Sequence, residues 1–231
     1  MDADERPPPL TAAGIAGLID HTLLAPEATP GQIETLCIEA VRFGFHAVCV
    51  NPCHLRQAAW LLAGEKPAPI TVAGFPLGAS LARAKAYEAA EAAALGAREI
   101  DMVMNLGWLK AGDREAVIRD IAAVVRAVTP LPVKVILETC LLGDEEKTLA
   151  CRLAHDAGAA FVKTSTGFAK AGATVEDVRL LRRCVDELSG GVMGVKASGG
   201  IKSLAQALAL VEAGASRIGA SASVRIVSGG L

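Results

Sequence analysis

The sequence predicts a single parallel (β/α)8 TIM barrel, an α/β fold. The first observation is a repeated junction, in which a helical stretch ends in glycine and an apolar, strand-like run follows. Glycine just past a helix adopts the left-handed conformation that turns the chain into the next strand. Four such glycines recur at intervals of 52, 62 and 56 residues: Gly44, Gly96, Gly158 and Gly214. Because one strand–helix unit needs about 30 residues, each interval has room for two units.

The second observation is that apolar runs fill the positions that a barrel requires. Four runs follow the glycines, and the others lie between them or before the first. In chain order, the expected strands are 18–24, 46–50, 70–75, 99–104, 133–138, 160–165, 192–197 and 217–221. Strands this continuously apolar are typical of a parallel sheet that helices cover, and a series of such units along the chain indicates a closed barrel.

The third observation is that helix starts lie between these strands. Thr29 can cap a helix in which Pro30 takes the first position and Gln32 the third. The segment 174–177 begins with threonine and places acidic residues in a first turn. The segment 114–128 carries apolar residues at helical spacing. Strands and helices therefore alternate throughout the expected barrel, residues 11–231.

Length and composition favour one large core. The chain has 231 residues, of which 52% are hydrophobic. Residues 1–10 are charged and rich in proline, and we expect them to form a short flexible extension. The alternative fold is a doubly wound open sheet. No G-x-G-x-x-G follows the first strand and no G-x-x-x-x-G-K-[ST] occurs, so the nucleotide-binding signatures of open sheets are missing.

Several classes of function have no support in the sequence. With 23 basic residues, 25 acidic residues and 3% aromatics, no nucleic-acid-binding surface is indicated. Charges or turn residues interrupt each apolar run before the roughly 18 residues of a membrane span. The charged start does not resemble a signal peptide, and six scattered cysteines suggest reduced thiols, so a cytoplasmic protein is expected. No metal site is expected: Cys49, Cys53 and His54 could form half of one, but no matching second half appears in the sequence.

Two lysines inside otherwise apolar strands are the most informative residues. Lys163 and Lys196 occupy the sixth and seventh strands, although lysine is depleted from strands and rarely buried. Side chains alternate along a strand, and the neighbouring valines suit the helix layer, so both lysines are expected to face the barrel interior. The same alternation turns Asp101, on the fourth strand, inward.

Two amines and a carboxylate in a barrel interior suggest Schiff-base chemistry. Two ammonium groups about 6 Å apart, at an effective dielectric near 20, repel by roughly 3 kcal/mol, equivalent to about two pKa units. One lysine can then be a neutral nucleophile while the other stays charged, and Asp101 can transfer protons. The residues alone do not show which lysine attacks. The competing interpretation is a buried ion pair with no catalytic role.

A phosphate site is predicted beside these residues. Gly199 and Gly200 follow the seventh strand and Ser221 follows the eighth. Barrels frequently bind phosphate in these two loops, through backbone N–H groups and a helix N-terminus. Thr166 and Gly167, after the sixth strand, are expected to add donors.

Weaker candidates lie on the first, second and fifth strands. Asp20 and Thr22 share the first strand and Cys49 ends the second, and all three are expected to line the mouth of the site. Lys134 and Glu138 share one face of the fifth strand, where they either extend the polar network or pair in the core.

These residues lie in motifs that resemble the 2-deoxyribose-5-phosphate aldolase family of class I aldolases. The resemblance extends from about residue 18 to residue 221. The motifs are Ile19-Asp-His-Thr-Leu-Leu24, Val48-Cys-Val-Asn-Pro52, Val72-Ala-Gly-Phe-Pro-Leu-Gly78, Glu99-Ile-Asp-Met-Val-Met-Asn105, Lys134-Val-Ile-Leu-Glu-Thr139, Phe161-Val-Lys-Thr-Ser-Thr-Gly-Phe168, Val195-Lys-Ala-Ser-Gly-Gly-Ile201 and Arg217-Ile-Gly-Ala-Ser221.

The resemblance implies a role for each of the three inward residues. Lys163 would form the Schiff base, Lys196 would perturb it, and Asp101 would donate and accept protons. The implied reaction is the reversible cleavage of 2-deoxy-D-ribose 5-phosphate to D-glyceraldehyde 3-phosphate and acetaldehyde, in deoxyribonucleotide catabolism. The resemblance also places the phosphate at the glycines and serine named above, and implies neither a metal nor an organic cofactor.

Two departures from the family pattern and two alternative functions belong beside this prediction. Some members carry a lysine where this chain has Phe168, and some end in a tyrosine tail, whereas this chain ends in Ser228-Gly-Gly-Leu231. The alternatives are a phosphosugar isomerase or similar barrel enzyme without a covalent intermediate, and a non-catalytic sugar-phosphate-binding barrel. A homo-oligomer, either a dimer or a tetramer, is expected.

Overall fold

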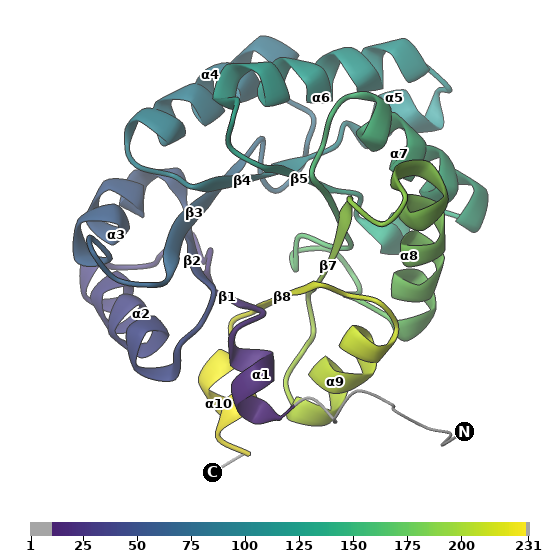
Figure 1. Ribbon diagram of the computed structural model, residues 1–231. Coiled ribbons are helices and arrows are strands. Elements are labelled where there is room, and N and C mark those ends of the chain that lie inside the picture. Colours follow the sequence, from purple (N-terminus) through teal and green to yellow (C-terminus); the bar gives the residue numbers. More distant parts are fainter. Residues whose placement is uncertain (1–10, 230–231) are drawn as a thin grey trace, which may run out of the picture.

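The predicted barrel is confirmed by the computed structural model, which describes residues 11–229; the expected flexible segment 1–10 lies outside them. The strands are β1 (Ile19–Leu23), β2 (Ala47–Val50), β3 (Ala68–Ala73), β4 (Glu99–Val103), β5 (Val133–Ile136), β6 (Phe161–Lys163), β7 (Gly194–Ser198) and β8 (Arg217–Ala220). They run parallel and follow one another around the barrel in chain order, and β8 pairs with β1 to close it (Figure 1).

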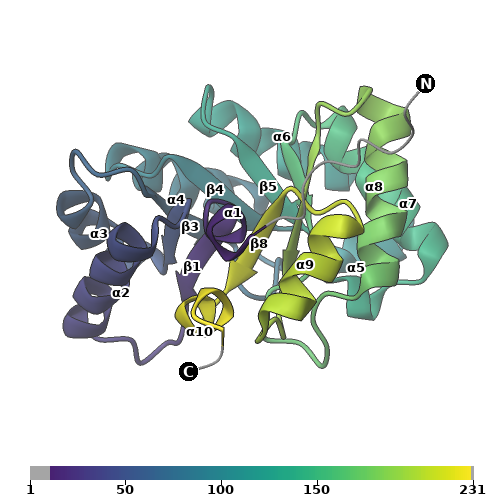
Figure 2. The same cartoon turned by 60° about the horizontal axis from the view of Figure 1, so that its bottom comes forward.

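Helices surround the barrel on its outside (Figure 1). They are α1 (Ala12–Ala16), α2 (Pro30–Phe43), α3 (Leu55–Leu61), α4 (Ala82–Ala94), α5 (Leu106–Lys110), α6 (Arg114–Val128), α7 (Asp144–Asp156), α8 (Val175–Ser189), α9 (Leu204–Glu212) and α10 (Ser223–Val227), with 3-10 turns η1 (Pro52–His54) and η2 (Thr139–Leu141). The first and last helices, α1 and α10, lie side by side next to β1 and β8 (Figures 1 and 2). From residue 11 to residue 229, no helix is both long and apolar enough to span a bilayer.

The local signals in the sequence form the expected caps. All four helix-ending glycines have positive φ, between 68° and 111°. At the start of α2, the Gln32 side chain accepts from the Thr29 N–H at 2.9 Å. The Thr174 hydroxyl accepts from the Asp177 N–H at 3.1 Å and begins α8. Helix α6 spans the predicted segment 114–128.

Three strands end two residues before their apolar runs: β3 at Ala73, β5 and β6. β5 stops at Ile136, and Glu138 then adopts a left-handed conformation with φ 53°. β6 stops at Lys163, three residues before Thr166 bonds to Glu138. After β5 and β6, the chain leaves the barrel wall to build the loops above it, which apolar patterning alone does not predict.

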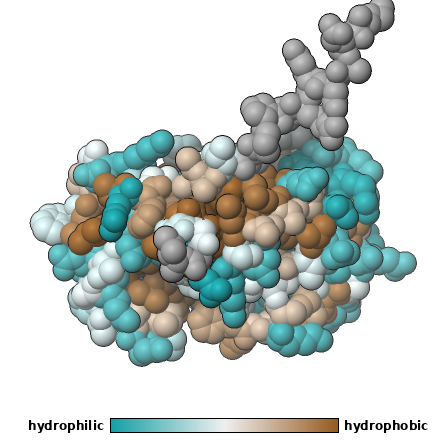
Figure 3. Space-filling view, turned by 90° about the horizontal axis from the view of Figure 1, so that it is seen from below, coloured by the Kyte–Doolittle hydropathy of each residue, from teal (hydrophilic) through white to brown (hydrophobic). Residues whose placement is uncertain are grey.

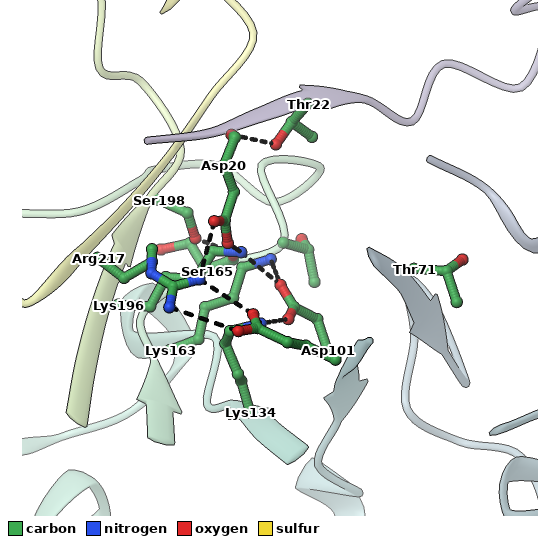
Figure 4. A network of polar contacts seen from close by, with 12 residues as sticks. Asp20, Thr22, Thr71, Asp101, Lys134, Lys163, Ser165, Lys196, Ser198 and Arg217 are labelled. Atoms are coloured by element: carbon green, nitrogen blue, oxygen red, sulfur yellow. Dashed lines mark hydrogen bonds and ion pairs between the residues drawn. The ribbon is translucent and has the colours of Figure 1, made fainter. Parts of the chain in front are cut away.

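The alternation of side chains sorts the strands into two environments. Val48, Val162 and Val195 belong to the large core between the barrel and its helices. A smaller apolar cluster on β2, β3 and the end of β1 contains Leu24, Ala47, Cys49, Ile70 and Val72. The polar inward side chains come from β1 and from β4 to β8, so they gather on the other side of the interior (Figure 4).

Candidate active site

Asp101 on β4 is the centre of a buried network of charged side chains. Its Oδ1 accepts from the Lys134 Nζ at 2.7 Å. Its Oδ2 accepts from the Lys163 Nζ at 2.8 Å and from the Lys196 Nζ at 2.7 Å (Figure 4). None of these four residues is more than 3% exposed. The structure therefore brings together the two lysines and the aspartate that the sequence turned inward.

The register of the sheet produces this convergence. Lys163 and Lys196 are direct partners across β6 and β7, and Asp101 and Lys134 are partners across β4 and β5. Residues paired across parallel strands point to the same face. Lys163 pairs with Ile136, two residues beyond Lys134, so both pairs point inward and the long lysine side chains meet at Asp101. On β8, a Cβ at Gly219 would lie 3.0 Å from the Lys196 Cε, so glycine leaves room for this lysine.

A second group of ion pairs adjoins these amines. Asp20 on β1 contacts Lys196 and accepts from the Arg217 Nη1 at 3.0 Å. Arg217 also donates to Glu99 at 3.0 Å, and the Lys134 Nζ lies 2.5 Å from the same Glu99 carboxylate. The network therefore extends from the site toward the start of the strands.

Charge balance in this network favours one neutral lysine. Its carboxylates are Asp20, Glu99 and Asp101, and its cationic side chains are Lys134, Lys163, Lys196 and Arg217. With every group ionised, the network carries one surplus positive charge. Because an uncompensated charge is unfavourable in a buried site, loss of one lysine proton balances it.

The pKa values of Lys163 and Lys196 shift in opposite directions. Burial lowers the pKa of Lys163, and repulsion from Lys196 adds to burial, although Asp101 opposes both. For Lys196, burial is outweighed by Asp101 and Asp20, so its pKa is raised. Burial also disfavours the Asp101 carboxylate, but Lys134 and the two site lysines hold its pKa well below its usual value. Of these two lysines, Lys163 is therefore the one that loses its proton more readily.

A cleft of about 470 Å³ opens above the network. Lys163 lies among its lining residues, and so does Thr22 on β1. The other lining residues come from the ends of four strands and the loops that follow them: Leu23, Leu24, Ala25, Pro26, Glu27, Thr166, Gly167, Phe168, Ser198, Gly199, Gly200, Ile201, Lys202, Gly219, Ala220 and Ser221. Gly199 and Gly200 have φ of 86° and 76°, a conformation that favours glycine. The Ser203 side chain caps α9 directly after them. The cleft thus contains the loops that the sequence associates with phosphate.

Three expectations about this cleft need correction. Asp20 and Cys49 do not line it. Asp20 is tied to Lys196 and Arg217, and Cys49 packs in the apolar cluster, where burial raises the pKa of its thiol to about 11. Both side chains point inward but lie below the mouth. Thr166 does line the cleft, but its N–H and hydroxyl already donate to Glu138.

Several residues of the site were not singled out from the sequence. Glu99 and Arg217 share the inward alternation of their strands, so strand periodicity could have found them. Of the two fifth-strand residues that the sequence does single out, Lys134 extends the network by bonding Asp101, whereas Glu138 turns away to Thr166. Lys202 enters the cleft from a loop, where no periodicity guides a prediction.

One cluster at the start of the strands has the composition of a metal site. Ligand atoms of Asp20, His46 and Glu99 lie within 4.8 Å of one another. Arg217 and Lys134 already neutralise these carboxylates. A divalent cation would therefore have to displace two buried positive charges, and the donor set does not fit a metal.

The protein is a (β/α)8 barrel with a cleft at the carboxyl ends of its strands, and a lysine of lowered pKa lies at the base of that cleft. This is the architecture of a lysine-dependent aldolase. The comparison with known families agrees. The chain belongs to the DeoC/LacD family of aldolases, whose profile matches residues 15–228.

Relatives of the chain carry consistent names. It is 56% identical, over 94% of its length and 98% of the relative, to the deoxyribose-phosphate aldolase of Natranaerobius thermophilus. A crystal structure from Coccidioides immitis, provisionally assigned the same activity, matches with a TM-score of 0.93 and 43% identity over 96% of this chain and 87% of the other. The deoxyribose phosphate aldolase of Aeropyrum pernix, described as a unique tetramer, matches with a TM-score of 0.88 and 35% identity over 94% and 91%.

Proposed function

We propose that this aldolase reversibly cleaves 2-deoxy-D-ribose 5-phosphate to D-glyceraldehyde 3-phosphate and acetaldehyde through a Schiff base on Lys163. One observation carries the choice of nucleophile. Of the three lysines on Asp101, Lys163 is the one that lines the cleft, whereas Lys134 and Lys196 are completely buried. The family and the names of its relatives support the reaction.

The site has the groups that each step requires. The neutral amine of Lys163 attacks the C1 aldehyde of the open-chain sugar, and loss of water leaves an iminium ion. Removal of the proton from the C3 hydroxyl breaks the C2–C3 bond; the bonding electrons pass to the iminium, which becomes an enamine, and glyceraldehyde 3-phosphate leaves. Protonation of the enamine at C2, followed by hydrolysis, releases acetaldehyde and restores the amine. Asp101 is held ionised beside the amine and serves as the proton acceptor.

The loops after β6, β7 and β8 suit the phosphate. Gly167, Gly199 and Gly200 allow a close approach of backbone to the ligand. Helix α9 begins at Leu204, directly after the lining residues 199–202, so the positive end of its dipole lies near the cleft. Lys202 adds a positive charge to the same wall. The cleft therefore distinguishes a phosphate end from the reactive end at Lys163.

Borohydride reduction in the presence of acetaldehyde tests the nucleophile. We expect one ethyl group on the peptide that contains Lys163 and none on the peptide that contains Lys196. The variant Lys163→Leu should show no ethylation and lose turnover, and exposed Lys66→Leu serves as the matched control. Turnover that survives Lys163→Leu would indicate an enzyme without a covalent intermediate. Binding of the sugar phosphate without turnover in the wild type would indicate a non-catalytic barrel.

We further propose that the chain acts as a homo-oligomer in the cytoplasm. Large apolar side chains are exposed on α2 and α3, with Ile38 60% and Trp60 75% accessible, and apolar areas also appear among polar side chains in the view of Figure 3. The related protein of Aeropyrum pernix is described as a tetramer. All six cysteines are free, which suits a reducing compartment. Light scattering and cell fractionation test the two parts of this proposal.

A further inference from the structure

Glu138, directly beyond β5, has an unusual backbone conformation. Its φ and ψ are 53° and 60°, and it is the one residue other than glycine with positive φ between residues 11 and 229. A side chain with a Cβ is disfavoured in this region, so the surrounding structure must hold it there. Such conformations concentrate at functional sites, where the strained residue positions a group.

The Glu138 side chain explains the conformation. Its carboxylate is almost completely buried, with 4% of the residue exposed. The Thr166 N–H donates to the two carboxylate oxygens at 3.2 and 3.3 Å, and the Thr166 hydroxyl donates to one of them. Within residues 11–229, no lysine, arginine or histidine forms an ion pair with it. The carboxylate is therefore stabilised by the loop that follows β6.

The Thr166 hydroxyl also fixes the next residues of the loop. The Thr166 Oγ1 accepts from the Phe168 N–H at 3.0 Å. Between these two residues lies Gly167, whose φ is 86° and which lines the cleft. A Cβ at Gly199 would lie 3.6 Å from the Gly167 Cα, so the two glycine loops face each other closely. Glu138 thus fixes the loop at Gly167, which lies opposite the loop at Gly199 across the cleft. Glu138 is not itself among the residues that line the cleft.

We infer that Glu138 is a positioning residue for the phosphate end of the substrate. Its buried carboxylate holds Thr166 and Phe168 so that the backbone at Gly167 faces the phosphate. The inference rests on the proposed function. It adds that discrimination between phosphorylated and unphosphorylated sugars depends on a carboxylate that does not bond to Lys163. Within residues 11–229 the Glu138 side chain forms no hydrogen bond or ion pair with the lysine network, although the neighbouring Leu137 N–H donates to the Lys163 carbonyl at 2.8 Å.

The test compares 2-deoxyribose 5-phosphate with unphosphorylated 2-deoxyribose in Glu138→Gln. The amide keeps the size of the side chain but loses its charge and one acceptor oxygen. We expect KM for the phosphorylated sugar to rise by roughly ten- to a hundredfold, as for a lost hydrogen bond to a charged group. Turnover of 2-deoxyribose and ethylation of Lys163 by acetaldehyde and borohydride should stay near the wild-type level. Glu145→Gln, on the exposed side of α7, is the matched control.

A second variant separates positioning from folding. Glu138→Gly suits the positive φ but has no carboxylate, so it should fold and still lose phosphate discrimination. The inference would be overturned if the ratio of kcat/KM for the two sugars is unchanged in Glu138→Gly, whether both values stay at the wild-type level or both fall by the same factor. If the wild-type protein shows no ethylation, the proposed function fails. If the wild-type protein is ethylated but the Glu138 variants keep full discrimination between the two sugars, only the inference about Glu138 fails.

Discussion

Lys163 and Lys196 are partners on adjacent strands, and both donate to the same oxygen, Oδ2 of Asp101. Their nitrogens therefore lie within about two hydrogen-bond lengths of each other. At that distance, and at an effective dielectric near 20, two positive charges repel by roughly 3 kcal/mol. A single carboxylate oxygen cannot fully offset two ammonium groups, so one of them is destabilised as a cation.

The neighbours of the two lysines decide which one is destabilised. Lys196 has a second carboxylate, Asp20, and is completely buried. Lys163 shares Asp101 with two other amines and borders the cleft. These neighbours favour loss of the proton from Lys163, which borders the cleft that a substrate carbonyl would enter.

Removal of the Lys196 charge should shift the pH profile of turnover. In the proposed mechanism only the neutral Lys163 amine attacks, so the acid limb of kcat/KM should follow the pKa of Lys163 in the free enzyme. Repulsion from Lys196 lowers that pKa. In Lys196→Leu the acid limb should move to higher pH by about one to two units. The proposed perturbation would be contradicted if the acid limb does not move in Lys196→Leu. It would also be contradicted if the acid limb moves equally far in the exposed control Lys66→Leu.

The buried pair of Lys85 and Asp120 offers a test that is independent of the reaction. The Lys85 Nζ donates to the Asp120 Oδ2 at 2.6 Å and to the Val103 carbonyl at 2.8 Å, and both side chains are completely buried. Lys85→Met should lower the free energy of unfolding by roughly 3–5 kcal/mol, because it leaves Asp120 without a partner. The double variant Lys85→Met/Asp120→Leu should regain most of the loss in urea unfolding. A single variant as stable as the exposed Lys66→Met would refute the argument.

The close approach of Gly172 to the phosphate loop predicts a defect in substrate binding. A Cβ at Gly172 would lie 2.0 Å from the Gly199 carbonyl oxygen, and backbone cannot give way as a side chain can. Gly172→Ala should displace the loop, raise KM for the phosphorylated sugar on the order of tenfold, and cost roughly 1–3 kcal/mol of stability. Gly31→Ala in α2 has no atom within 4 Å of the new Cβ and should bind as the wild type. Equal KM values for the two variants would show that the loop tolerates the shift.

The carboxylates of the network predict how stability depends on pH. Burial opposes ionisation of Glu99, but His46, Lys134 and Arg217 outweigh it and lower the pKa of Glu99; the pKa values of Asp20 and Asp101 are lowered too. A carboxylate with a depressed folded-state pKa stabilises the fold above its unfolded pKa of about 4, and this stabilisation is lost as the pH falls further. The midpoint temperature of thermal unfolding should therefore be nearly constant from about pH 7 to pH 5 and fall steeply below about pH 4. In Glu99→Gln the acid slope should be shallower; an unchanged slope would assign acid sensitivity to other groups.

Periodicity predicted more of the site than any other sequence signal. In β4, β6 and β7, alternation with outward apolar residues placed Asp101, Lys163 and Lys196 on the inner face, because a strand has only two faces. The same rule applied to Glu99 and Arg217, which were overlooked. It could not place Lys202 in the cleft, or show that Thr166 bonds to Glu138, since loops have no repeating geometry. It also could not tell the cleft from the layer beneath it, so Asp20 and Cys49 were expected at the mouth.

The sequence by itself determined the barrel, its strand order and the inward lysines, because glycine caps, apolar runs and strand alternation are local properties of the chain. The resemblance to a family supplied the reaction that we propose for those residues. Only the tertiary structure decided the depth at which each charged group lies and the number of opposite charges it meets. These quantities depend on register across strands far apart in sequence, and they separate Lys163, at the cleft, from Lys196, buried between two carboxylates.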